Sequence, residues 1–256
     1  MSRWIRITHE DQPRFGLLED GEIRLCSGEM FGSPGITGET VPLASATLLP
    51  PVEPRQFLGL WNNLEQRRIA EENFTPKFPL WFVKLPTCVI ASGEKITRPP
   101  AFTGKVKIEA ELGVVIGKEC FNVPVEKVDD YIFGYTCVND VTAPETLFEE
   151  EGFTHWCRAK SYRSFGPIGP VITTDIDPDE LRVQGILDGE VKQDYPVSDM
   201  IFGAREIVSM ISREVLLLPG DVIACGTSLG ASDMLPGQTI EIVIEGIGRL
   251  ENRYAG

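Results

Sequence analysis

The sequence predicts a mainly β protein with a few helices. Runs of β-branched and aromatic residues recur along most of the 256 residues, and turn signals such as Asp188-Gly189 and Pro236-Gly237 separate them. One segment has a clear helical spacing of apolar residues, AREIVSMISREVLLLPG at 204–220, and it ends at a Pro-Gly stop. The predicted class is therefore α+β, with strands in the majority.

The N-terminal part predicts a small strand-rich segment. Two β-type stretches, RWIRITHE and RFGLLEDGEIRLCS, precede the proline-rich connector LLPPVEPRQF. We therefore expect a small β segment over residues 1–53 and a main domain over residues 54–256. Just after the connector, NNLEQRRIAEENF has helical composition, but its apolar residues are too sparse for their spacing to define a helix.

Composition excludes several function classes. The net charge of -14 repels a polyanion, so a nucleic-acid partner is not expected. No uncharged apolar run approaches the length of a membrane span, and the N-terminus lacks the apolar core of a secretory signal. The six cysteines form no CxxC pair, which is typical of reduced core residues in a cytoplasmic protein.

The residue types also restrict the metals that this chain could bind. With only His9 and His155 available, a metal site must be built from oxygen ligands, which favours magnesium, manganese or calcium. A carboxylate substrate would be repelled by so acidic a protein unless a cation screened its pocket.

Three acidic residues form the candidate metal site. In IEAELGVVIGK, a strand places Glu109 and Glu111 on the same face, where two like charges repel each other unless a cation joins them. Asp140 ends the apolar run YIFGYTCVND and is the third candidate. Spacing alone also allows a solvated strand face for the two glutamates and a helix-capping role for Asp140.

Several ordered motifs give the chain a resemblance to the fumarylacetoacetate hydrolase family, in its C-terminal-domain type. IEAELGVVIGK resembles the metal-binding ExEL strand of that family, and GYTCVNDVTA resembles its Asn-Asp turn. The match runs from about Phe57 to Tyr254, and its other motifs are RAKSYRSFGPIGP, YPVSDMIFGAREIVSMIS, LLPGDVIACGTSLG and LPGQTIEIVIEGIGRLENR.

The resemblance implies a rolled, mixed β-sandwich, a catalytic domain over residues 54–256 and a homodimer. It implies one Mg²⁺ or Mn²⁺ on Glu109, Glu111 and Asp140, with positions open for substrate oxygens. Substrates of such enzymes are 2-oxo acids, acylpyruvates or their enols, and the metal acts as a Lewis acid that stabilises an enolate.

The resemblance also implies roles for further residues. Lys160 matches the active-site lysine of the family, and a nearby dication should lower the pKa of its ammonium group. Thr227 matches a threonine that binds the substrate carboxylate, and Gly226 allows the backbone to approach the ligand. Lys84 matches a lysine behind the metal. Each has a plainer alternative: a surface lysine for Lys160, local backbone bonding for Thr227, a turn for Gly226 and ion pairing for Lys84.

One segment departs from the family pattern. Hydrolytic and decarboxylating relatives carry a histidine and a nearby glutamate in a lid, where the pair activates water. The corresponding GLWNNLEQRRIAEEN has no histidine, and Glu65 or Gln66 falls near its place. Gln66 cannot act as a general base. Glu65, Glu71 or Glu72 could, and we expect Glu65 as a catalytic and Gln66 as a substrate-binding residue. His155 is expected to be partly exposed, with the border of the pocket as the alternative.

The missing histidine decides the order of the functional hypotheses. The first is a Mg²⁺- or Mn²⁺-dependent isomerase or tautomerase that acts on a 2-hydroxy-dienedioate, such as 2-hydroxyhepta-2,4-diene-1,7-dioate, or an oxaloacetate-like enol. A role in aromatic catabolism would fit this hypothesis and the second alike. The second is an acylpyruvate-type C–C hydrolase or a 2-oxo-acid decarboxylase. The third is a degenerate protein that binds metal and oxo acid without turnover.

Overall fold

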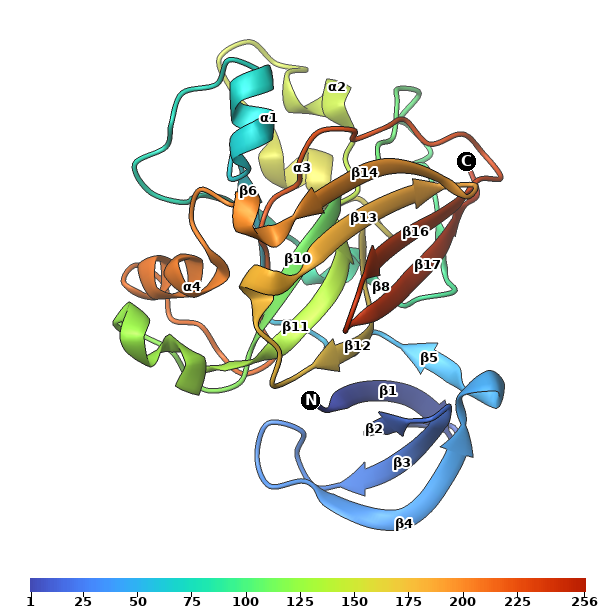
Figure 1. Ribbon diagram of the computed structural model, residues 1–256. Coiled ribbons are helices and arrows are strands. Elements are labelled where there is room, and N and C mark those ends of the chain that lie inside the picture. The colour runs from blue at the N-terminus through green and yellow to red at the C-terminus, as the bar shows by residue number, and fades with distance from the viewer.

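The computed structural model describes the chain from Met1 to Gly256 and contains two mixed β-sheets with few helices (Figure 1). The larger sheet has twelve strands and the smaller has five. The prediction of a mainly β protein with a few helices is confirmed.

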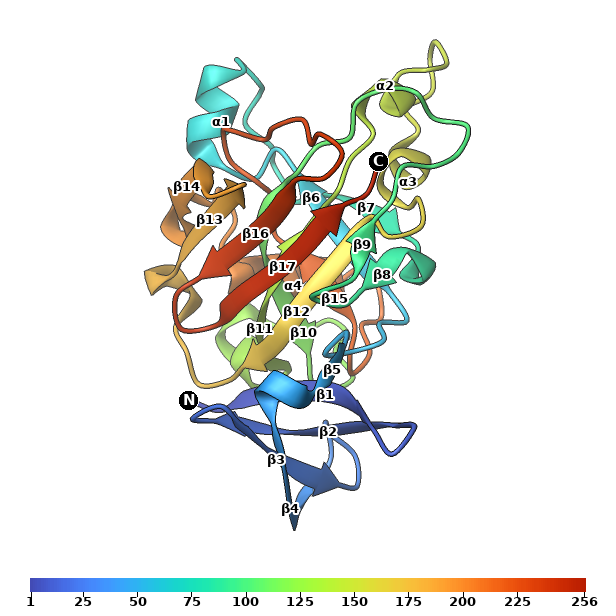
Figure 2. The same ribbon diagram turned by 90° about the vertical axis from the view of Figure 1, so that its right-hand side faces the viewer.

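The N-terminal strands form an antiparallel meander at one end of the larger sheet (Figure 2). Its strands are β1 (Arg3–His9), β2 (Gln12–Glu19), β3 (Glu22–Ser27) and β4 (Gly35–Pro42), and the short β5 (Thr47–Leu49) pairs with β1. Strand β1 also pairs with β12 of the main body, so the meander and the main domain share one sheet. The division at residue 53 stays a prediction.

The rest of the larger sheet carries the residues of interest. In spatial order it contains β12 (Gly166–Thr173), β11 (Ile132–Asn139), β10 (Ala110–Ile116), β15 (Val222–Ala224), β6 (Phe57–Trp61) and β7 (Leu80–Lys84), with β8 (Val89–Ile90) paired to β12. The β15–β6 and β8–β12 pairs are parallel, and the other pairs in this part are antiparallel.

The smaller sheet packs against the middle of the larger one. Its order is β14 (Glu190–Pro196), β13 (Arg182–Leu187), β16 (Thr239–Ile244), β17 (Gly248–Tyr254) and β9 (Lys95–Ile96). Strand β13 contacts β10, and β16 and β17 contact β11. Every residue of β10 is therefore buried between layers, which explains its continuous apolar run.

The helices cover the ends and edges of the sheets (Figure 1). They are α1 (Glu65–Ala70), α2 (Pro144–Leu147), α3 (Trp156–Lys160) and α4 (Ala204–Ser212). None of them is long and apolar enough to cross a membrane.

Helix α4 is shorter than its sequence pattern predicts. It begins after Gly203, whose N–H donates to the Glu206 carboxylate, and it buries Ile207, Val208 and Ile211. The helix ends at Ser212 because the following chain turns away and pairs in extended form, with Leu217 bridged to Cys120. The apolar residues from 213 to 218 therefore belong to an extended stretch that pairs with a distant segment, and not to a longer helix.

Candidate active site

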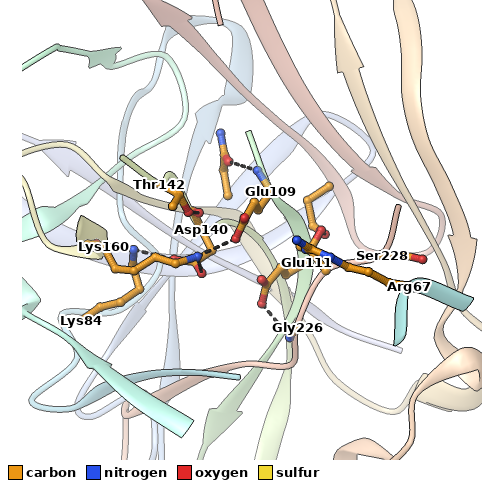
Figure 3. A network of polar contacts seen from close by, with 12 residues as sticks. Arg67, Lys84, Glu109, Glu111, Asp140, Thr142, Lys160, Gly226 and Ser228 are labelled. Carbon is orange, nitrogen blue, oxygen red and sulfur yellow. Dashed lines mark hydrogen bonds and ion pairs between the residues drawn. The ribbon is translucent and has the colours of Figure 1, made fainter. Parts of the chain in front are cut away.

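The three predicted acidic residues meet at one end of the β10–β11 pair. These strands are antiparallel with Ala110 opposite Asn139, so Glu109 and Asp140 lie side by side, and the Asp140 N–H donates to the Glu109 carbonyl at 2.9 Å. Glu111 points to the same side as Glu109 because side chains alternate along a strand. One carboxylate oxygen from each of the three lies within 4.8 Å of the others (Figure 3).

Two buried lysines balance the charge of this cluster. Lys160 Nζ donates to Glu109 Oε2 at 2.5 Å and to Asp140 Oδ2, and Lys84 Nζ donates to Asp140 Oδ1 at 2.6 Å. Lys84 Nζ also donates to the Lys160 carbonyl, so it fixes the end of α3 as well as Asp140. Lys160 is only 3% exposed, so a surface role for it is wrong. Lys84 forms an ion pair with Asp140, which is the alternative role predicted for it from the sequence.

The pKa values follow from burial and from these neighbours. Burial, followed by repulsion from Asp140, raises the pKa of Glu111 well above its ordinary value. Burial would also raise the pKa of Asp140, but attraction by Lys160 and Lys84 lowers it overall. For Lys160, burial would lower the pKa, but attraction by Asp140 and Glu109 raises it. The predicted lowering of the Lys160 pKa applies to a site that holds a dication, because the dication would repel the ammonium group.

The donor set fits a hard divalent cation. Glu111 Oε2 accepts a hydrogen bond from the Gly226 N–H at 2.7 Å, whereas Glu111 Oε1 is buried without any hydrogen-bond partner. A buried carboxylate oxygen without a partner is costly, and a cation would remove that cost. Three carboxylates and no histidine or cysteine form an all-oxygen set, which suits Mg²⁺ or Mn²⁺.

Glu109 and Lys160 line a cavity of about 810 Å³, and Glu111 and Asp140 lie buried beside them. Aromatic side chains from β6, β7 and α3 line one part of it. Polar groups line another part, including Lys107, Thr227 and Ser228. Such a combination of a largely apolar wall with a few polar groups is typical of small-molecule sites.

Thr227 lines this cavity, whereas the neighbouring Gly226 does not line it and contacts Glu111. Thr227 Oγ1 donates to the Ala110 carbonyl at 2.9 Å and accepts from Gln193 Nε2 at 2.8 Å. The Ala110 carbonyl also accepts from the Tyr195 hydroxyl, so it keeps a partner if Thr227 turns to another acceptor. The Gly226 N–H donates its hydrogen bond to Glu111, so Gly226 orients the Glu111 carboxylate.

The lid segment does form a helix, α1, but its predicted residues lie away from the cavity lining. Glu65 binds the Arg68 guanidinium at 2.7 Å, and the Gln66 N–H donates to Asp199. The residues of α1 and its end that line the cavity are Arg67 and Glu71. The physical reason is the helical turn: Arg67 and Glu71 are four residues apart and share a face that Glu65 and Gln66 do not.

Arg67 is the site residue that sequence reasoning missed. It extends from α1 toward Glu109 and Glu111 in Figure 3, and its Nε donates to Glu71 Oε1 at 2.9 Å. Burial acts to lower the pKa of its guanidinium, but attraction by Glu109 and Glu71 raises it overall. The i,i+4 spacing of Arg67 and Glu71 in the sequence was the available signal, since such pairs share one helix face.

Asn63 explains how the lid helix is held over the site. Its Nδ2 donates to the Cys225 carbonyl at 2.8 Å, and its Oδ1 accepts from the Phe202 N–H at 3.0 Å. The loop that contains Gly226 and the start of α1 are therefore joined by one buried side chain.

His155 lies outside the cavity lining. Its ring packs edge-on against Phe153 with the centroids 4.8 Å apart, and it is partly exposed, as expected from the sequence. The cysteines are all free; five are buried and Cys157 is exposed.

Lys84→Met is expected to destabilise the protein by about 3–5 kcal/mol, because it leaves Asp140 buried with one of its ion-pair partners removed. Urea unfolding in the presence of a chelator would measure the loss. Lys127→Met, at an exposed lysine, is the control and should change the free energy of unfolding by less than about 0.5 kcal/mol. An equally small loss for Lys84→Met would mean that this ion pair does not stabilise the fold.

Two family models match this chain, and together they cover most of its length. The family model described as fumarylacetoacetate (FAA) hydrolase C-terminal matches residues 56–255, and a model described as Rv2993c-like, N-terminal matches residues 2–51. Protein Rv2993c of Mycobacterium tuberculosis is 38% identical over 96% of each chain. Oxaloacetate tautomerase YisK of Bacillus subtilis is 34% identical over 72% of this chain and 64% of its own length.

A solved structure has the same fold over nearly its whole length. It is that of 2-hydroxyhepta-2,4-diene-1,7-dioate isomerase from Mycobacterium marinum, with a TM-score of 0.91, 34% identity, and coverage of 100% of this chain and 98% of that chain. With a family model that matches 56–255 and this agreement in fold, the chain belongs to the fumarylacetoacetate hydrolase family.

Proposed function

We propose that this protein is a Mg²⁺- or Mn²⁺-dependent isomerase or tautomerase that acts on a 2-oxo acid or its enol. The observation that carries the proposal is the buried cluster of Glu109, Glu111 and Asp140 with Lys160 paired to two of its members. Glu109 and Lys160 face a cavity whose lining contains no histidine. A proton shift needs a charge-stabilising centre and a group that moves a proton, but no activated water.

Glu109, Glu111 and Asp140 would hold the cation. When bound, a divalent cation supplies Lewis acidity that stabilises negative charge on the substrate oxygens. Lys84 would keep Asp140 oriented toward it, and the Gly226 N–H would do the same for Glu111.

Thr227 would bind the substrate carboxylate. Its hydroxyl can turn from the Ala110 carbonyl without leaving that oxygen unsatisfied, because the Tyr195 hydroxyl donates to it at 2.6 Å. Gln193 bonds to Thr227 and also accepts from the Ala110 N–H, so the threonine is held from the smaller sheet.

Lys160 would move the proton. Its Nζ lies against two of the three carboxylates and within the cavity lining, so it can exchange a proton with a substrate carbon placed above it. In the ketonisation of an enol, one proton leaves the enol oxygen and one is added to the neighbouring carbon, so the substrate keeps all its atoms. Glu71 is a second carboxylate in the lining that can accept a proton, with Arg67 holding it in place.

The named relatives support this order of hypotheses. The isomerase from Mycobacterium marinum matches this chain over 98% of its own length, and the relative from Bacillus subtilis at 34% identity is an oxaloacetate tautomerase. Both reactions rearrange a 2-oxo acid or its enol without adding water.

The test is a product assay. Purified protein with Mg²⁺ or Mn²⁺ is incubated with oxaloacetate, acetylpyruvate and a 2-hydroxy-dienedioate, and enol absorbance is followed beside product analysis. For at least one of the three compounds we expect enol decay with the carbon number unchanged, and no catalysis by Glu109→Ala. The release of acetate, pyruvate or carbon dioxide would instead favour the hydrolase or decarboxylase, and silence from the wild type would favour the non-catalytic binder.

A further inference from the structure

A continuous chain of aromatic rings leads from the carboxylate cluster to the mouth of the cavity. Lys160 Nζ lies 5.1 Å from the centroid of the Phe82 ring, and Phe82 stacks on Trp156 with 5.1 Å between centroids. Trp156 contacts Trp61 at 5.9 Å, and Trp61 contacts Phe74 at 6.1 Å. All four rings line the same cavity as Glu109 and Lys160.

Phe82, the ring nearest the carboxylate cluster, packs over the backbone of Gly59. Phe82 is buried and lies opposite Gly59 on the neighbouring strand, where a side chain at Gly59 would overlap the Phe82 ring at 2.6 Å. At the outer end, Phe74 is 61% exposed. The apolar wall therefore begins beside the reacting groups and remains open outward.

The charges in the cavity lining disfavour a second carboxylate. Its cations are Arg67, Lys107 and Lys160, and each already has an acidic neighbour within 4.0 Å. The lining also includes the carboxylates of Glu71 and Glu214, outside the metal-binding trio. A distal carboxylate would be repelled by Glu71 and Glu214, and the three cations of the lining could compensate it only while also serving their present acidic partners.

We propose that the substrate carries an apolar, ring-sized substituent on its 2-oxo-acid head group, and that Phe82, Trp156, Trp61 and Phe74 select it. This inference rests on the proposed function for the position of the head group. Burying a flat ring against aromatic faces gains both apolar area and ring–ring contact. The cavity volume of about 810 Å³ exceeds what a four-carbon oxo acid would fill.

The test compares two unreactive ligands that share one head group. N-phenyloxamate carries a phenyl ring on the oxamate head, and N-oxalylglycine carries a carboxylate in its place. With Mn²⁺ present, their binding is measured by isothermal titration calorimetry, which gives the same readout for every variant. We expect the phenyl ligand to bind at least about tenfold more tightly, which corresponds to roughly 1.4 kcal/mol.

A pair of phenylalanine variants locates the effect. Phe74→Ala removes the exposed outer ring and should reduce the preference for the phenyl ligand about threefold or more. Phe121→Ala is the matched control, because Phe121 is 59% exposed and lies outside the cavity lining. Trp156→Ala should abolish most of the preference, and since Trp156 is partly buried its folding is checked by circular dichroism.

The outcomes separate this inference from the proposed function. Equal binding of the two ligands, or tighter binding of N-oxalylglycine, would overturn the apolar-substituent proposal and leave the metal-dependent site intact. An unchanged preference in both Phe74→Ala and folded Trp156→Ala would also overturn it. If neither ligand bound in the presence of Mn²⁺, the head-group site itself would be wrong, and both proposals would fall.

Discussion

Glu111→Gln is expected to lower kcat/KM by on the order of 10³, because it removes one of three anionic ligands from a centre whose Lewis acidity is worth several kcal/mol. Mn²⁺ affinity should fall by more than about 100-fold, since even residues that only orient a ligand contribute roughly 10–100-fold. The variant should fold, because the glutamine carbonyl can still accept the Gly226 N–H. The free Mn²⁺ signal in electron paramagnetic resonance measures the affinity directly.

The same variant has a readout that does not depend on turnover. A cation that binds only the folded wild type at 100 times its dissociation constant stabilises the protein by about 2.7 kcal/mol, and Glu111→Gln should lose most of that gain. Glu126→Gln, at an exposed glutamate, is the control and should keep it. If Glu111→Gln retained the Mn²⁺-dependent rise in Tm, Glu111 would not be a ligand.

Lys160→Ala is expected to reduce kcat by roughly 10²–10⁴, the usual contribution of a positioned proton-transfer group, with a smaller change in KM. The reason is that Lys160 Nζ is the only ammonium group that contacts both Glu109 and Asp140, at the floor of the cavity. Steady-state kinetics on the best substrate of the panel would measure both parameters. Lys118→Ala, at an exposed lysine, should leave them unchanged.

A second measurement distinguishes the catalytic role of Lys160 from a structural one. Without metal, Lys160→Ala leaves two buried carboxylates without this partner, so the protein should be less stable than the wild type in a chelator. Saturating Mn²⁺ should restore much of that stability, because the cation compensates the same charges, but it should not restore kcat. Recovery of both would assign Lys160 a purely structural role.

Local sequence patterns predicted much of the fold. Continuous apolar runs identified β10 and β11, because a strand between two layers must be apolar on both faces. Alternating runs identified β16 and β17, which bury one face only. The extent of α4 was predicted less well, since the apolar residues after Ser212 serve pairing with a distant segment. Helical periodicity cannot distinguish these two uses of an apolar run.

The sequence by itself determined the residue types and their local order: a pair of glutamates on one strand face, an aspartate at the end of another apolar run, and an all-oxygen donor set. The family membership also follows from the sequence, because its motifs occur in order over most of the chain.

Only the tertiary structure decided which groups meet. The pairing of β10 with β11 placed Asp140 beside Glu109, and α3 brought Lys160 between them. The turn of α1 directed Arg67 and Glu71, and not Glu65 or Gln66, into the cavity. The aromatic chain joins residues from β6, α3 and β7 that are far apart in sequence. Such contacts depend on how distant segments pack, and no local pattern of residues encodes that.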